Sequence, residues 1–309
     1  MADLCKLSTE LQNIAEVELS EIPNRVKDDI AYIRKWLTEQ HHLIARTDDH
    51  TLLIFLRNCK FSLEKTKAKI DLYYTIKSMF PKIFKNRDPF QPKIQYVLQN
   101  NIVSFLPKVS NGPFLLLVRG ANANPDVVSM EDALKFAILL TEISLQHHVE
   151  SSIVGHAILL DFKDASLKYF LQFTPAFLKK LATCFANVFL LRMKALYIIN
   201  LPLTLVTGSN IFKSFLSPKL QNRVFFYLNN DLDGIQQHFP ASVLPTEYGG
   251  DAGSFTDFCA QLKATVESYQ EWILDDEQYL CIEEKRPSSN SYDVNFFSVE
   301  GSFRKLEID

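Results

Sequence analysis

Several residues in this chain are of the types that enzymes use, but their spacing does not match a catalytic or metal site. Residues 208–214 end in Lys-Ser like a phosphate-binding loop, yet the second glycine of that loop is missing. His147 and His148 are adjacent, so on a helix they point about a quarter turn apart rather than toward one metal ion. Asp161 and Asp164 could form a carboxylate pair, although an aspartate that ends a strand more often makes turn hydrogen bonds. We therefore predict that the protein is not an enzyme and holds no cofactor or metal.

Four basic residues form two pairs whose spacing suits the binding of an anion. Arg192 and Lys194 alternate on the approach to a predicted strand, so both side chains can point to one side. Lys219 and Arg223 are four residues apart and share one face if their segment is helical. Most such pairs are solvated surface charge, but arginine and lysine also both bind phosphate well. The spacing alone leaves both interpretations open.

The composition indicates a globular protein without a general attraction to polyanions. The chain has 309 residues, of which 47% are hydrophobic and 22% are charged, and the net charge is -3. This length is typical of one large or two small domains, and the charge argues against nucleic acid as a partner. The 24 phenylalanines form either an aromatic core or the lining of a cavity.

The cysteines and the hydrophobicity profile predict a cytoplasmic protein. The number of cysteines is odd and no CxxC pair occurs, which favours reduced thiols over disulfides or a zinc site. The first residues contain no apolar signal core, and no apolar run reaches the length of a membrane span. The cysteines are Cys5, Cys59, Cys184, Cys259 and Cys281.

Helical periodicity dominates the first part of the chain. Apolar residues recur at helix spacing from Val26 to Leu37. Thr47 is predicted to cap a helix that begins with two aspartates, and Ser62 is predicted to cap the next helix. Prolines at 81, 89 and 92 then predict a linker of about a dozen residues.

After these prolines the pattern predicts strands that alternate with helices. Short apolar runs at 114–118, 157–162, 196–200 and 224–228 are the strand candidates. Ser129 opens a capping box, and Thr174-Pro175 supplies an N-cap and a first-turn proline. This alternation is typical of an α/β fold with a mainly parallel sheet.

Residues 203–216 are predicted to form a helix. Leu205, Phe212 and Phe215 share one face, so the helix could simply pack on the sheet. Gly208 and Ser209 in its middle weaken it by roughly 1 kcal/mol, which suits an element that moves. Ser217-Pro218 is predicted to start another helix.

The order of several signature segments between Asp161 and Gly250 resembles the CRAL-TRIO family, and most of all its tocopherol transfer and retinaldehyde-binding members. These segments are Asp161-Phe162-Lys163-Asp164, Asn200-Leu201-Pro202, Phe215-Leu216-Ser217-Pro218-Lys219 and Leu244-Pro245-Thr246-Glu247-Tyr248-Gly249-Gly250. The resemblance implies a small N-terminal helical domain (1–85), a CRAL-TRIO lipid-binding domain (86–255), and a C-terminal helix and tail (256–309). It also implies flanking helices around the sheet and a lid helix, 203–216, over an apolar pocket. Asp164 departs from the glycine that many members carry after the strand.

The resemblance also implies two sets of binding residues. Ala137 and Thr141 stand where tocopherol-binding members carry serine hydroxyls, so only Thr141 offers a hydrogen bond to a ligand. The lipid-binding set is Leu134, Ala137, Thr141, Leu160, Phe173, Phe177, Leu181, Cys184, Phe185, Leu196, Ile211 and Phe215. The set that matches the phosphoinositide-binding patch of the tocopherol transfer proteins is Arg57, Arg192, Lys194, Lys219 and Arg223.

Three functions compete on the sequence alone. The first is a monomeric carrier that buries one hydrophobic molecule of isoprenoid type, such as a tocopherol, retinoid or carotenoid, and makes transient contact with phosphoinositide-containing membranes to release it. The second is a transfer protein or sensor for phospholipids or phosphoinositides. The third, an enzyme of unrecognised chemistry, has no motif in its favour.

Overall fold

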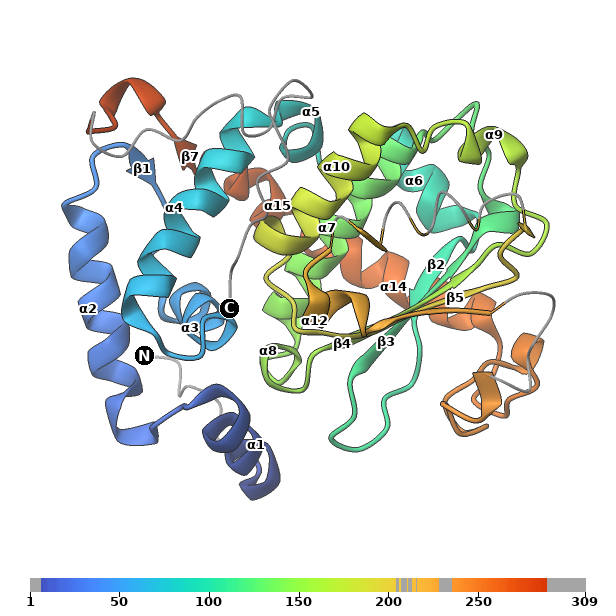
Figure 1. Cartoon of the computed structure of the whole chain (residues 1–309), viewed down its shortest axis with the longest axis horizontal. Coiled ribbons are helices and arrows are strands. Elements are labelled where there is room, and N and C mark those ends of the chain that lie inside the picture. Colours follow the sequence, from blue (N-terminus) through green and yellow to red (C-terminus); the bar gives the residue numbers. More distant parts are fainter. Residues whose placement is uncertain are drawn as a thin grey trace.

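The structure is a computed structural model and describes residues 7–203, 206, 210, 213–214, 216–227 and 235–287. Helices at the N-terminal end stand beside a central sheet that carries helices on both faces (Figure 1). The predicted lid helix lies largely outside the described residues. The arrangement is α/β with a mainly parallel sheet, as the alternation of strand and helix patterns predicts.

The N-terminal helices bury the apolar positions that the sequence pattern indicates. In α2 (Val26–Thr38), the apolar residues at helix spacing are buried. The predicted cap of α3 (Asp49–Asn58) is wrong by one residue, because the carboxylate of Asp48, not Thr47, accepts from the backbone N–H of Thr51 at 2.9 Å. Ser62 precedes α4 but its side chain makes no capping bond. The remaining helices of this part are α1 (Thr9–Leu19), α4 (Leu63–Met79) and α5 (Pro81–Phe84).

The predicted proline linker begins with one helix and ends where another begins. Pro81 and Pro92 each open a helix, because a proline in the first turn loses no hydrogen bond that the helix would make. These helices are α5 and α6 (Pro92–Gln99). The domain boundary near residue 85 therefore falls between two short helices and stays a prediction.

Within the described residues, the central sheet has five strands in the order β2-β3-β4-β5-β6. Neighbours pair in parallel except β2 and β3, which pair antiparallel. The four parallel strands match the four predicted runs. β2 was not predicted, because Ser104 interrupts its apolar residues, whereas the equally short β6 lies in the uninterrupted apolar run 224–228. The strands are β2 (Val103–Phe105), β3 (Phe114–Arg119), β4 (His156–Asp161), β5 (Met193–Ile199) and β6 (Val224–Phe226).

The two faces of the sheet are covered to different degrees. One face packs against α14 (Phe255–Ser268), and its residues Leu117, Leu159 and Ile199 are buried. The other face packs against α7 (Met130–His147) and α10 (Pro175–Thr183), whose predicted capping box and N-cap are both present. On this second face, several large apolar side chains stay partly exposed.

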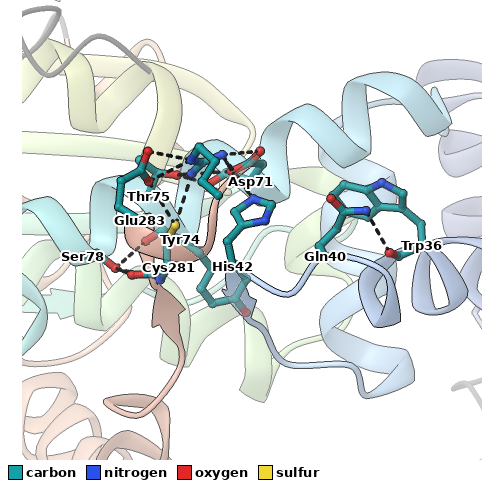
Figure 2. A network of polar contacts seen from close by, with 10 residues as sticks. Trp36, Gln40, His42, Asp71, Tyr74, Thr75, Ser78, Cys281 and Glu283 are labelled. Carbon is teal, nitrogen blue, oxygen red and sulfur yellow. Dashed lines mark hydrogen bonds and ion pairs between the residues drawn. The ribbon is translucent and has the colours of Figure 1, made fainter. Parts of the chain in front are cut away.

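The C-terminal segment returns to the N-terminal helices. A two-stranded antiparallel sheet pairs β1 (Leu43–Ile44) with β7 (Leu280–Cys281), and Ser78 of α4 exchanges two hydrogen bonds with the backbone of Cys281 (Figure 2). The acidic end of α15 (Gln270–Asp276) also lies here. Its Asp276 is buried and binds Lys77 at 2.5 Å and Arg87 at 2.6 Å. These contacts tie residues 256–287 to the first 90 residues.

Candidate functional site

An apolar wall forms where α7 and α10 face the second side of the sheet. Along β4, Leu159 is buried on the first face, while Ile158 and Leu160 point to the second face and stay partly exposed. Phe162 continues this row beyond the strand and is also partly exposed. A row of large apolar side chains that folding leaves incompletely buried is typical of the lining of a binding site.

Aromatic rings extend the wall from the sheet to α10. The ring of Phe162 lies 5.5 Å from that of Phe170, and Phe173 lies 5.9 Å from Phe177 between ring centroids. Leu181 and Phe185 pack against two apolar clusters at once, one with the N-terminal helices and α7, and one with the sheet. The wall therefore contacts both the N-terminal helices and the central sheet.

The structure brings most predicted lipid-binding residues into these two clusters. Cys184 lies at the start of a π-helical turn (Cys184–Val188) that follows α10, and burial raises the pKa of its thiol to about 12, so the thiol stays uncharged. Ile211 and Phe215 lie outside the described residues. The members that the two clusters contain are Leu134, Ala137, Leu160, Phe173, Phe177, Leu181, Cys184, Phe185 and Leu196.

Thr141 is the polar member of the predicted set and lies buried in α7. Its hydroxyl donates to the carbonyl of Ala137 one helical turn earlier, at 2.8 Å. The donor is thus used inside the helix, but the hydroxyl oxygen can still accept a hydrogen bond. A ligand hydroxyl is the kind of group that this oxygen suits.

One cavity of the described residues lies away from the apolar wall. It is a surface hollow of about 430 Å³ between α6 and α7, and it shares no residue with the predicted lipid-binding set. Its lining mixes apolar residues with Asp132, Lys93 and Lys135. Lys93 and Asp132 form an ion pair of 2.7 Å there.

Basic residues gather at the opposite end of the sheet from Asp161. Arg192 and Lys194 lie at the start of β5, and both bind one carboxylate oxygen of Glu18, at 2.6 and 2.9 Å. Their predicted orientation to one side is thereby confirmed. Gly155 permits this geometry, because it has φ +82° and a Cβ there would lie 2.4 Å from the carbonyl oxygen of Arg192.

Lys219 and Arg223 belong to the same cluster, but not by the predicted helix face. The helix α12 (Pro218–Gln221), capped by Ser217 as predicted, ends before Arg223. Arg223 instead donates to the backbone carbonyl of Met193 in β5. Burial lowers the pKa of Lys219, and the nearby charges of Arg223, Lys60 and Arg192 lower it further. The cations are therefore close enough to repel one another, a condition that favours an anion among them.

Two residues differ from what the sequence predicts for this cluster. Lys60 belongs to the cluster but was not predicted, and no local pattern in the sequence marks it. Arg57 was predicted as a member, yet it is buried and binds both carboxylate oxygens of Glu21, at 2.9 and 3.2 Å. It also donates to Ser152. These bonds give Arg57 a structural role in this conformation.

The signature residues at the other end of the sheet form one hydrogen-bonded network. Asp161 accepts from Tyr248 at 2.6 Å, from Asn200 at 2.7 Å and from the backbone N–H of Lys163 at 2.8 Å. Asp161 thus makes the turn hydrogen bonds that are typical of an aspartate at the end of a strand. Asp164 adopts φ +55°, which explains why a glycine suits this turn. The network fixes the loops that follow β4 and β5.

Comparisons with known proteins identify the family. A model of the CRAL/TRIO domain matches residues 99–250, and a model of the Pinta-like, UBA domain matches residues 22–94. The human protein named "Alpha-tocopherol transfer protein-like" is 30% identical over 252 residues, which cover 81% of this chain and 72% of that protein. The chain belongs to the CRAL-TRIO family.

Other relatives agree with this assignment. Clavesin-1 of Xenopus laevis is 27% identical over 246 residues, which cover 79% of this CRAL-TRIO chain and 74% of clavesin-1. The crystal structure of Sfh5 superposes with a TM-score of 0.52 at 14% identity and covers 89% of this chain and 99% of its own. At that identity the likeness shows the fold alone. Family membership makes this a lipid-binding protein.

Two further properties of the described residues bear on other kinds of site. They contain no helix long and apolar enough to cross a membrane. Within the same residues, no group of three or more His, Cys, Asp or Glu side chains could hold a metal ion.

Proposed function

We propose that this CRAL-TRIO protein is a monomeric cytoplasmic carrier that holds one hydrophobic molecule against the apolar wall. The ligand is of isoprenoid type, such as a tocopherol, retinoid or carotenoid. The observation that carries this proposal is the row of partly exposed apolar side chains Ile158, Leu160 and Phe162, which shares one apolar cluster with α10 and with Phe173, whose ring contacts that of Phe177. Covering such a row with a ligand removes apolar surface from water at about 25 cal/mol per Å². No enzymatic step, cofactor or metal is part of this function.

Release at phosphoinositide-containing membranes is the second part of the proposal. Leu167 and Leu171, which follow β4, and Leu203, which follows β5, are 69%, 81% and 68% exposed and suit contact with a bilayer at the end of these strands away from the basic residues. The basic cluster of Arg192, Lys194, Lys219, Arg223 and Lys60 supplies the attraction to anionic headgroups. Each basic residue near an anionic membrane contributes about 1 kcal/mol.

Ligand identity is tested by solvent extraction of the purified protein followed by mass spectrometry. Titration with fluorescent analogues of tocopherol, retinoid and phospholipid then gives the affinities. Saturable one-to-one binding of an isoprenoid analogue is the expected result. A phospholipid in the extract would instead favour the alternative, a phospholipid or phosphoinositide transfer protein or sensor, which the basic cluster supports. The carrier proposal fails if none of the three analogues binds saturably.

Release is tested with Lys219→Ala, measured as ligand transfer to neutral vesicles and to vesicles that contain phosphoinositide. We expect about fivefold slower transfer to the phosphoinositide vesicles only, because one cation near the membrane is lost. Lys82→Ala on α5 makes the same charge change outside the basic cluster and should behave as wild type. Equal loss on both vesicles would indicate general damage, and no loss on either would remove the basic cluster from the release step.

A further inference from the structure

The anion site of the basic cluster already holds an anion that belongs to the protein. One oxygen of the Glu18 carboxylate lies 2.6 Å from a guanidinium nitrogen of Arg192 and 2.9 Å from the ammonium nitrogen of Lys194. Glu18 is on α1, more than 170 residues earlier in the chain. A carboxylate in this position makes the charge-assisted bonds that a phosphate oxygen would make.

Two glutamates at the end of α1 are held very differently. Glu21 follows the helix and is buried against Arg57, with an ion pair of 2.9 Å. Glu18 lies within the helix, and its side chain is 42% exposed. Between them, Ser20 ends the helix in the left-handed conformation, with φ +60°. Glu21 thus anchors the chain after α1, whereas Glu18 is accessible to water and to competing anions.

The apolar contacts of α1 are few. Ala15 and Leu19 pack with Ile153 of α8 (Ser151–Val154), and Leu7 and Ile14 are partly buried against them, in a small cluster separate from the main core. Val17 on the same helix is 76% exposed, and α1 lies at the edge of the molecule beside α8 (Figure 1). An element with so little buried apolar surface opens at low cost in free energy.

We propose that α1 is a removable cap whose Glu18 occupies the anion site of Arg192 and Lys194 and restricts that site to polyphosphorylated headgroups. The inference rests on the proposed function, in which the basic cluster binds anionic lipid. A headgroup with one negative charge gains too little from the two cations to displace Glu18. A phosphomonoester carries up to two charges and three acceptor oxygens, so a phosphoinositide displaces the carboxylate.

The charge state of Glu18 agrees with this role. Hydrogen bonds from Arg192 and then from Lys194 lower its pKa to about 2. The carboxylate therefore stays ionised at every physiological pH, and protonation does not release it. Competition from another anion remains as the means of release.

The test compares wild type with Glu18→Gln, which keeps the shape of the side chain and removes its charge. Glu16→Gln is the matched control, since Glu16 is exposed on the same helix and its side chain contacts Gln12 rather than a cation. Binding is measured to vesicles of phosphatidylcholine alone, with added phosphatidylserine, and with added phosphatidylinositol bisphosphate. Thermal melts establish that each variant is folded.

We expect Glu18→Gln to bind phosphatidylserine vesicles about fivefold more tightly than wild type, with a smaller gain on bisphosphate vesicles. Glu16→Gln should match wild type on all three. Hydrogen exchange provides the second measurement, because the amides of α1 in wild type should exchange faster when bisphosphate vesicles are added. Identical binding by the two glutamine variants would overturn the proposal that α1 is a removable cap. Unchanged protection of the α1 amides from hydrogen exchange in the bound protein would overturn it as well.

Failure of the proposed function gives a different pattern. In that case wild type does not prefer bisphosphate vesicles, and Lys219→Ala changes nothing. If wild type does prefer them through Lys219 while Glu18→Gln equals Glu16→Gln, the proposed function stands and only the cap is wrong.

Discussion

Phe177 is the wall residue whose replacement gives the clearest test of ligand binding. It packs against the cluster of the N-terminal helices and α7, and its ring contacts Phe173 on the side of the sheet. Because Phe177 is only partly buried, an aspartate there can reach water without a ligand. With an apolar ligand bound, the carboxylate would lose that water at a cost of several kcal/mol.

Phe177→Asp should therefore abolish binding of the ligand analogues and leave a folded protein. Leu274→Asp, at an exposed position on α15, introduces the same group away from the wall and should bind normally. Affinity is measured by fluorescence titration and folding by circular dichroism. Native folding together with wild-type affinity in Phe177→Asp would exclude this side chain from the pocket.

His156 makes stability depend on pH. It is buried at the start of β4, where burial lowers its pKa from 6.5 to about 3 and its Nε2 pairs with Ser144. The unfolded chain takes up a proton below about pH 6.5, while the folded protein does not. The contribution of His156 to the free energy of unfolding is therefore fully present above pH 6.5. It falls by about 1.4 kcal/mol per pH unit as the pH drops toward 3.

Denaturant unfolding of wild type and His156→Gln between about pH 7 and 5 measures this contribution. We expect the variant to lose about 2 kcal/mol less than wild type by about pH 5. His41→Gln, at an exposed histidine, should keep the wild-type slope. The same slope in all three proteins would show that His156 is protonated in the folded state.

At the scale of elements, Gly155 links the end of α8 to the position of β5. Its φ is +82°, and a Cβ at this position would lie 2.4 Å from the carbonyl oxygen of Arg192. Gly155→Ala should therefore destabilise the protein through this clash as well as through backbone strain. Gly253→Ala is the matched control, since Gly253 also has a positive φ of +113° but its Cβ would meet only Phe258 at 3.7 Å. Chemical denaturation should show Gly155→Ala less stable by about 1–3 kcal/mol beyond the control. Equal losses of stability in the two variants would mean that the backbone at Arg192 moves away from the added Cβ at little cost in free energy.

The elements that the sequence predicts well are those with local signals. The capping box at Ser129, the caps at Thr174 and Ser217, and the four parallel strands follow from residues close together in the chain. The strands β1 and β7 have two residues each, too few for a periodic pattern, and their pairing with each other across the chain defines them. β2 is as short as the predicted β6, but Ser104 interrupts its apolar residues.

In the candidate site, too, some features can be predicted from the sequence and others depend on contacts between distant residues. The resemblance to the family locates the wall and four members of the basic cluster. It does not predict the ion pairs of Glu18 and Glu21, since these depend on how α1 packs against residues far along the chain. For the same reason it assigns Arg57 to the cluster although Glu21 binds its guanidinium.

At the scale of the whole molecule, buried charges join the N-terminal helices to α7 and α15. Arg87 binds Glu142 and Asp276, both at 2.6 Å, and Asp276 also binds Lys77 and Arg46. Burial disfavours the Asp276 carboxylate, but Lys77 and Arg87 outweigh this effect and hold its pKa below the usual value. Loss of one charge leaves buried cations without compensation.

Asp276→Asn should therefore lower the free energy of unfolding by about 3–5 kcal/mol. Asp275→Asn removes the neighbouring carboxylate, whose ion pair with Arg46 is 46% exposed on the aspartate side, and should cost at most about 1 kcal/mol. Urea unfolding of both variants gives the comparison. Similar losses would show that the buried cluster adds no more than a surface pair.

The return of the C-terminal segment also sets the order in which a newly made chain can reach its final form. Arg46 binds Asp276 across 230 residues of sequence, and β1 pairs with β7. During synthesis the N-terminal part of a protein generally emerges and folds first. Here Arg46, Lys77 and Arg87 leave the ribosome long before the carboxylate of Asp276. A chain halted after residue 255 should therefore hold these cations without that carboxylate and be cut more readily by proteases than the finished protein.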